Sequence, residues 1–207
     1  MPVLDRPLIE DDEFSLIRLE VDSEFEDQKI ARFDCGREDL TDFFRNDALN
    51  HHRQLLATTF FLQPKRATEG NIFLPVALIS FLNDSITITK EERKSEKRRF
   101  FALLKKTIPH PKRHYKSFPA VKIGRLGVSN KYQRQHLGTT VLNLTKQLFV
   151  TKNKTGCRFI TVDAYNDKTT DFYQKNGFEF LFDEDRTEET RIMYYDLISH
   201  AVENNAE

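Results

Sequence analysis

Hydrophobic residues along the chain repeat with two different periods, which predict two kinds of secondary structure. Spacings such as Leu137, Val141, Leu144 and Leu148 are typical of an amphipathic helix. Alternating or continuous short apolar runs are typical of strands. The predicted helices span 38–54, 90–107, 137–152 and 167–177. The predicted strands span 14–21, 57–63, 74–82, 120–128, 158–164, 178–182 and 191–197.

The order of these elements predicts the fold class. Strands 57–63 and 74–82 flank the short turn KRATEGN, so we expect them to pair antiparallel. The succession of strand, helix, strand, helix and strand from 120 to 182 predicts one parallel crossover. We therefore predict a single α/β (α+β) domain over 1–207, with a basic helical insertion at about 83–118.

The composition is that of a folded protein, and its net charge suggests no partner. Hydrophobic residues make up 39% of the 207 positions, and Lys plus Arg equals Asp plus Glu at 32 each. The two cysteines, Cys35 and Cys157, form no CxxC motif, which is typical of packed residues in a reducing cytoplasm. We find no signal peptide, no metal-ligand spacing and no apolar run near the roughly 20 residues of a membrane helix. We expect a cytoplasmic protein.

The charges are unevenly distributed, and the segment 90–116 carries eleven Lys or Arg against three Glu. Phosphate-rich RNA would be attracted to such a segment. The run EERKSEKRR mixes both signs, so a solvated amphipathic helix is an equally simple interpretation. The segment could also form one wall of a small-molecule site or a contact in a homodimer.

The loop KYQRQHLGTT at 131–140 is a candidate phosphate site. It follows a predicted strand and opens a predicted helix, whose first N–H groups lack partners and lie at the positive end of the helix dipole. The alternative is an ordinary turn between a strand and a helix. Gly138 is present, but His136 stands where a second glycine is expected, which a negative φ at His136 would allow.

Two stretches resemble motifs of the GNAT (Gcn5-related N-acetyltransferase) superfamily. GRLGVSNKYQRQHLGTTVL resembles the central motif, in which a strand ending in RLxV precedes Q/R-x-x-G-x-G/A and a helix. Gln133 takes its first position and Gly138 its last, while His136 replaces the usual first glycine. VDAYNDKTTDFYQKNGFEF resembles the C-terminal motif, in which a helix bearing FYxKxGF follows an Asn. The two occur in the family's order, each in its predicted structural context.

The resemblance implies a GNAT-like fold and a site. The fold would be a mixed, mostly antiparallel central sheet flanked by helices, with the parallel strands 120–128 and 158–164 splayed apart. Acetyl-CoA would be the donor, with no metal, and Asn166 would contact it. Tyr173 would protonate the departing thiolate, unless it is a core residue with a satisfied hydroxyl. The remaining predicted cofactor-binding residues are Leu126, Gly127, Val128, Gln133, Arg134, Gln135, His136, Leu137, Gly138 and Thr139.

The N-terminal half is similar to a narrower GNAT subgroup, the toxins of toxin–antitoxin pairs. The matching stretch is RFDCGREDLTDFFRNDALNHHRQLLATTFFL, with FDCG at 33–36, Leu40, Phe43, Phe44 and the strand residues 59–61. The similarity implies an antitoxin protein as partner and the α-amine of aminoacyl-tRNA as acceptor. The acceptor would otherwise be a small-molecule amine or a protein amine. A GNAT-fold binding module, with its cofactor site blocked by His136, is the alternative from another class.

Overall fold

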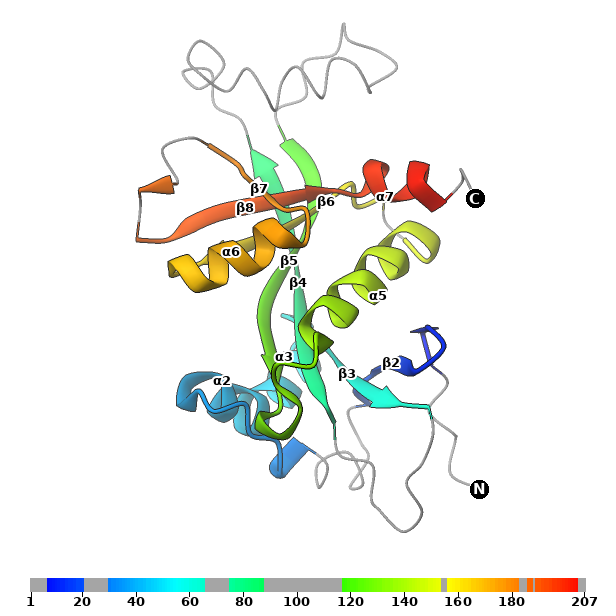
Figure 1. The fold of residues 1–207 in the computed structure, drawn as a ribbon, viewed down its shortest axis with the longest axis vertical. Coiled ribbons are helices and arrows are strands. Elements are labelled where there is room, and N and C mark those ends of the chain that lie inside the picture. The colour runs from blue at the N-terminus through cyan, green and yellow to red at the C-terminus, as the bar shows by residue number, and fades with distance from the viewer. Residues whose placement is uncertain are drawn as a thin grey trace, which may run out of the picture. The chain divides into compact units, whose positions relative to one another are not determined.

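A computed structural model describes residues 7–20, 30–65, 75–87, 117–153, 156–182, 186–187 and 189–204. Figure 1 labels most of its elements along the chain. The strands are β1 (Ile9–Glu10), β2 (Phe14–Arg18), β3 (Thr58–Pro64), β4 (Ala77–Thr87), β5 (Ser117–Val128), β6 (Phe159–Ala164), β7 (Glu179–Phe180) and β8 (Arg191–Asp196). The helices are α2 (Glu38–Asp42), the π-helical turn η1 (Phe43–Asp47), α3 (Ala48–Arg53), the 3₁₀ turn η2 (Asn130–Tyr132), α5 (Leu137–Thr151), α6 (Asp167–Lys175) and α7 (Leu197–Asn204).

The strands pair in the order β1-β2-β3-β4-β5-β6-β8-β7. The sheet is mixed, mostly antiparallel with one parallel pair, which confirms the predicted fold class. The chain forms two compact units: a first unit of residues 1–82, 123–154 and 200–207, and a second unit of residues 83–122 and 155–199. Strands β4 and β5 contribute residues to both units. The single domain over 1–207 stays a prediction.

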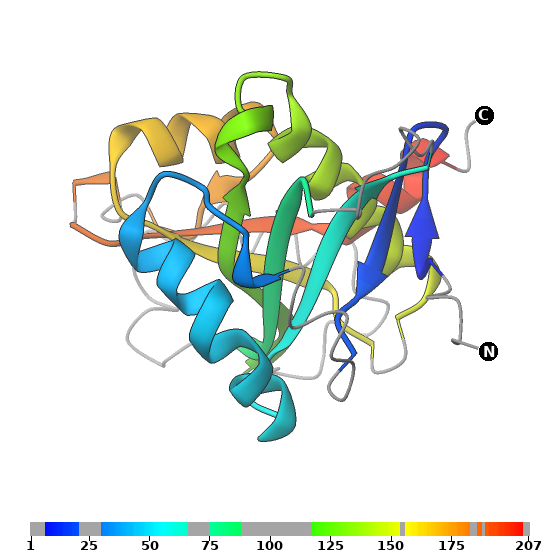
Figure 2. The ribbon, with the colours of Figure 1, turned by 90° about the horizontal axis from the view of Figure 1, so that it is seen from below.

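In the first unit, α2, η1 and α3 form one continuous rod, blue in Figure 2. Phe44 anchors this rod, because its side chain is fully buried and the rings of Phe33 and Phe43 meet it edge-on at 5.4 and 5.5 Å. Ile17, Cys35, Ala48, Phe61 and Leu78 belong to the same buried cluster. The FDCG stretch is therefore part of the hydrophobic core that attaches the rod to strands β2, β3 and β4.

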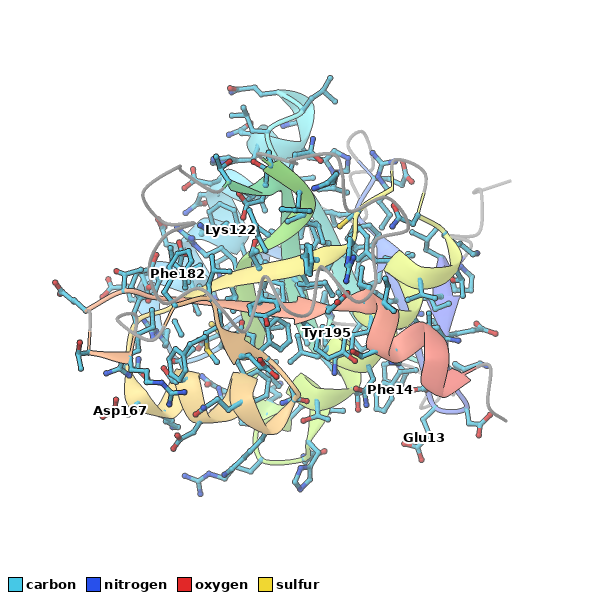
Figure 3. The ribbon with its side chains drawn as sticks, turned by 90° about the horizontal axis from the view of Figure 1, so that it is seen from above. Glu13, Phe14, Lys122, Asp167, Phe182 and Tyr195 are labelled. Atoms are coloured by element: carbon cyan, nitrogen blue, oxygen red, sulfur yellow. The ribbon has the colours of Figure 1, made fainter. Side chains whose placement is uncertain are left out.

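In the second unit, β6 and β8 pair antiparallel over their whole lengths, from Phe159 opposite Asp196 to Ala164 opposite Arg191. A two-pronged ion pair fastens one end of this ribbon, with Arg158 Nη2 lying 2.8 Å and Nε 3.2 Å from the two oxygens of the buried Asp196 carboxylate. Lys122, labelled in Figure 3, joins β5 to β6 through an ion pair of 2.6 Å with Asp163. The strands of this unit are thus tied by side chains as well as by backbone.

Most predicted elements are present, but some boundaries are wrong. Strand 74–82 continues as β4 to Thr87, and strand 120–128 begins at Ser117, so 83–87 and 117–118 are strand and not insertion. Ile86 explains the extension, because its side chain is only 3% exposed while its neighbours alternate outward. The predicted helix 90–107 lies outside the described residues.

A C-terminal helix was not predicted. Strand 191–197 ends at Asp196, and α7 follows directly. The Asp196 carboxylate accepts a hydrogen bond of 3.2 Å from the backbone N–H of Ile198, as a helix N-cap residue does. Asp196, a residue type that favours helix N-caps, was therefore a signal for this helix in the sequence. The ion pair that the same carboxylate forms with Arg158 could be found only in the structure.

Two helices end in the same hydrogen-bonded motif with different residues at its left-handed position. After α6, Gly177 has φ +82° and its N–H donates to Gln174 O, while Phe178 N–H donates to Tyr173 O. After α3, Leu55 has φ 58° and donates to His52 O, and Leu56 donates to His51 O. These are Schellman motifs, which favour glycine at the position that Leu55 occupies.

We predict that Leu55→Gly raises the free energy of unfolding by roughly 0.5–1 kcal/mol, because glycine adopts a positive φ without the Cβ penalty. The substitution loses little burial, since the Leu55 side chain is 87% exposed. Urea unfolding would measure the change. Leu56→Gly is the matched control and should not stabilise, since Leu56 has no positive φ. Equal losses in both variants would contradict the prediction.

Candidate active site

The loop between β5 and α5 carries a run of backbone donors without acceptors. From Arg134 to Thr139, no backbone N–H has a hydrogen-bond acceptor among the described residues. The first bonded amide is that of Thr140, which donates to His136 O at 3.1 Å. The last three members of the run open α5, so they also lie at the positive end of the helix dipole. This arrangement fits a bound anion such as a phosphate.

Two residues of this loop lie in the left-handed region. Arg134 has φ 64° and His136 has φ 60°. His136 directly precedes the right-handed residues of α5, and such a left-handed to right-handed step turns successive N–H groups toward a common centre, as in an anion-binding nest. The condition set for a histidine at this position, a negative φ, is therefore not met. The sharp entry from the loop into α5 requires the left-handed turn, and histidine tolerates that turn better than a β-branched residue does.

The Gln133 side chain holds the exposed loop to the rest of the first unit by hydrogen bonds. Its Nε2 group lies 2.8 Å from Cys35 O, 3.1 Å from Val128 O and 3.2 Å from Asn130 Oδ1. Gln133 was predicted to bind the cofactor. The structure commits its amide hydrogens to protein carbonyls, so its predicted role stands only for its backbone.

The end of β5 lies against the FDCG segment. A Cβ atom on Gly127 would lie 3.1 Å from the Phe44 ring and 3.3 Å from Cys35 Sγ, so Gly127 allows the strand to approach both. Leu126 and Val128 are half-buried. The Val128 carbonyl already accepts the bond from Gln133. The predicted contacts of these three residues with a pantetheine arm stay predictions.

In the second unit, Asn166 is the N-cap residue of α6. Its Oδ1 accepts hydrogen bonds of 2.9 Å from both the N–H and the hydroxyl of Thr169. This is the usual chemistry of an asparagine N-cap. The Asn166 side chain is exposed, and its Nδ2 group is the part that remains available to a ligand.

The end of α6 fixes the position of Tyr173. In the Schellman motif that Gly177 allows, the residue after the glycine packs on the residue that starts the last turn. Here Phe178 follows the glycine and Tyr173 starts the last turn, and their ring centroids lie 5.2 Å apart. Phe172 adds an edge-on contact at 5.1 Å. The letters FYQKNGF thus have a packing role as well as a predicted chemical one.

The Tyr173 hydroxyl is buried and protonated at neutral pH. The side chain is 4% exposed, and burial raises the pKa of its hydroxyl well above the ordinary value, so the group stays protonated at neutral pH. Among the described residues, the structure records no hydrogen bond that commits this hydroxyl. The catalytic role of this hydroxyl stays a prediction, and a core tyrosine stays its alternative.

Each unit therefore holds part of the predicted site. The first unit brings together Leu126 to Val128 and Gln133 to Thr139, and the second holds Asn166 and Tyr173 on one helix. Sequence reasoning missed Asp34, Gly36 and Asn130, which contact the loop from behind. The FDCG pattern was the available signal for the first two. Within the described ranges, no His, Cys, Asp or Glu group could hold a metal ion, and no helix is long and apolar enough to cross a membrane.

Residues 106–178 match the family model described as the acetyltransferase (GNAT) family. This segment therefore carries the sequence pattern of a GNAT acetyltransferase. The match covers the loop with its unpaired N–H groups, the capping Asn166 and the buried Tyr173, so the described parts of the site fall within it. A comparison with curated proteins found no match.

Several solved structures share the fold of this chain. AtaTR bound with acetyl-CoA has 20% sequence identity and a TM-score of 0.67, covering 93% of this chain and 98% of that one. A tyrosine-to-phenylalanine mutant of KacT has 19% identity and a TM-score of 0.65, covering 91% and 97%. AtaT complexed with acetyl-methionyl-tRNAfMet has 20% identity and a TM-score of 0.66, covering 91% and 98%. At these identities the likeness shows the fold.

The left-handed conformation of His136 generates a prediction about the loop. His136→Gly should keep or improve CoA affinity, because glycine adopts the same φ without strain. His136→Val should weaken CoA binding about tenfold, because a β-branched residue costs roughly 1–2 kcal/mol in this region. Calorimetric titration with CoA compares the three proteins. A severe loss in His136→Gly would show that the imidazole itself contacts the ligand.

Proposed function

We propose that the protein is an acetyl-CoA-dependent N-acetyltransferase that transfers an acetyl group to a primary amine. The observation that carries this proposal is the run of N–H groups from Arg134 to Thr139, which have no acceptor among the described residues and lie at the start of α5 in the segment that matches the GNAT family model. These groups suit the pyrophosphate of CoA. Acetyl-CoA supplies the activated acetyl thioester. The bound ligand of AtaTR, a structure of the same fold, supports this choice.

Tyr173 is the residue that we assign to the leaving group. An amine that attacks the thioester carbonyl displaces a thiolate, which must gain a proton. The Tyr173 hydroxyl is protonated at neutral pH, as any tyrosine is, and we assign it this proton because it lies in the matching motif on α6. Burial raises its pKa, so the hydroxyl gives up its proton only to a strong base such as the departing thiolate. The α6 packing with Phe178 holds the ring in place for this task. The exposed Nδ2 group of Asn166 would contact the cofactor from the start of the same helix.

Tyr173→Phe should lower kcat by roughly 10²–10⁴-fold, the usual contribution of a general acid. The Kd for acetyl-CoA should change little, because the ring packing with Phe178 is retained and only the hydroxyl is lost. Steady-state kinetics on a reactive amine and calorimetry with acetyl-CoA measure the two quantities. An unchanged kcat would mean that another donor protonates the sulfur.

For the acceptor, we propose the α-amine of aminoacyl-tRNA, with an antitoxin protein as regulator. AtaT, which shares the fold, has been solved with acetyl-methionyl-tRNAfMet and with the C-terminus of the antitoxin AtaR. The resemblance of 32–62 to the toxin subgroup and the basic segment 90–116 support the same assignment. A small-molecule or protein amine is the competing acceptor, with the basic segment serving as a solvated surface.

Expression in a bacterial cell should arrest growth, and the arrest should require Tyr173. Reversing the charges of Arg93, Lys94, Lys97, Arg98 and Arg99 should raise the KM for charged tRNA and flatten its salt dependence, because fewer counterions are released on binding. Activity on a small amine should be unchanged. Reversal of the exposed Arg32 and Lys152 is the matched control. Healthy growth with abundant folded protein that binds acetyl-CoA would reject the toxin assignment and leave the acetyltransferase proposal intact.

A further inference from the structure

The Gln133 amide joins three parts of the first unit. It donates to Cys35 O in the FDCG turn, to Val128 O at the end of β5 and to Asn130 Oδ1 in the loop, at 2.8, 3.1 and 3.2 Å. An amide NH₂ group has two hydrogens, and protein oxygens accept both. The reverse orientation would set the Gln133 carbonyl oxygen against two backbone carbonyls. Gln133 therefore keeps no side-chain donor for an anion.

The turn at 34–36 is built to receive this contact. The Asp34 carboxylate accepts from Gly36 N–H at 2.8 Å, and the Asp34 carbonyl accepts from Asn130 N–H at 2.9 Å. Gly36 has φ +74°, and a Cβ atom on it would lie 2.5 Å from Asn130 Oδ1. Glycine is thus required here by both the backbone angle and the close approach of the loop.

The same turn is attached to the buried core. Cys35 is 5% exposed, and its N–H donates to the buried Thr41 hydroxyl at 3.3 Å. Thr41 is in α2, and Phe44 of the same rod packs behind Gly127. The turn is therefore packed in the core on one side and hydrogen-bonded on the other to an exposed loop that contains two left-handed residues.

We propose that the 34–36 turn and Gln133 form a latch, defined by Asp34, Gly36, Asn130 and Gln133, that positions the loop for ligand binding. Gln133 is a positioning residue whose side chain does not touch the ligand. This assignment rests on the proposed function only for the identity of the ligand. The latch keeps the N–H groups from Arg134 to Thr139 available to a ligand. Without the latch, the loop would relax to a conformation in which these groups form hydrogen bonds with other parts of the protein.

The first test is Gln133→Met, which keeps length and removes both donors without adding charge. CoA should bind roughly tenfold more weakly, which is the loss expected for two or three partly exposed hydrogen bonds. The kcat at saturating acetyl-CoA should not change, because Tyr173 is untouched. In the free protein, the amides of Asn130 and Tyr132 should exchange with solvent faster, since both are hydrogen-bonded within the latched loop. Gln147→Met on α5 is the matched control.

The second test is a double-mutant cycle with Gly36→Ala, which disturbs the latch from its other side. If Gln133 acts through the turn, the double variant should bind CoA no more weakly than the worse single variant. If Gly36→Ala fails to fold, Asp34→Ala replaces it. Asp34→Asn should then keep wild-type affinity, because its side-chain oxygen can still accept from Gly36.

Additive losses in the cycle, together with unchanged amide exchange in the free Gln133→Met protein, would overturn the proposal and show that Gln133 contacts the ligand directly. Wild-type affinity in Gln133→Met would overturn it as well. A wild-type protein that does not bind CoA would contradict the proposed function instead. The amide-exchange comparison would still decide whether the latch exists, because it needs no ligand.

Discussion

The main constraint on this protein is the unsatisfied backbone of a short loop. Polar backbone groups in folded proteins are nearly always paired with protein or water. The stretch from Arg134 to Thr139 offers consecutive N–H groups that have no acceptor among the described residues and are left to solvent or a ligand. Two positive φ angles shape this stretch, and each costs free energy in a residue other than glycine. A conformation of this kind persists only when its surroundings hold it in place.

The rest of the first unit supplies that support. Phe33, Cys35 and Phe44 are buried together, and the turn that contains Cys35 lies against both the loop and the end of β5. The π-helical turn η1 begins at Phe43, next to this contact. Such turns are frequent at functional sites because they re-aim side chains within a helix. The FDCG stretch therefore connects a hydrophobic core to the loop that we propose as the phosphate site.

Much of this could be predicted from the sequence, because periodicity reports which faces are buried. The helix from Leu137 and the glycine that ends α6 are examples. The positive φ of His136 could not be predicted, because a histidine, unlike a glycine, does not by itself indicate a left-handed backbone. The use of the Gln133 side chain depended on carbonyls far away in sequence, and no local pattern reports such contacts. The residues around Ile86 are mostly polar, so their alternation of exposed and buried positions was not recognised as a strand.

The most direct test of the account is nuclear magnetic resonance of isotope-labelled protein during titration with acetyl-CoA. Phosphate oxygens that accept hydrogen bonds from the loop should shift the amide resonances from Arg134 to Thr139 downfield. S-acetylpantetheine, which lacks the pyrophosphate, should leave these resonances in place. Binding of acetyl-CoA that leaves these amides unshifted, or equal shifts with both ligands, would contradict the assignment of this loop as the phosphate site.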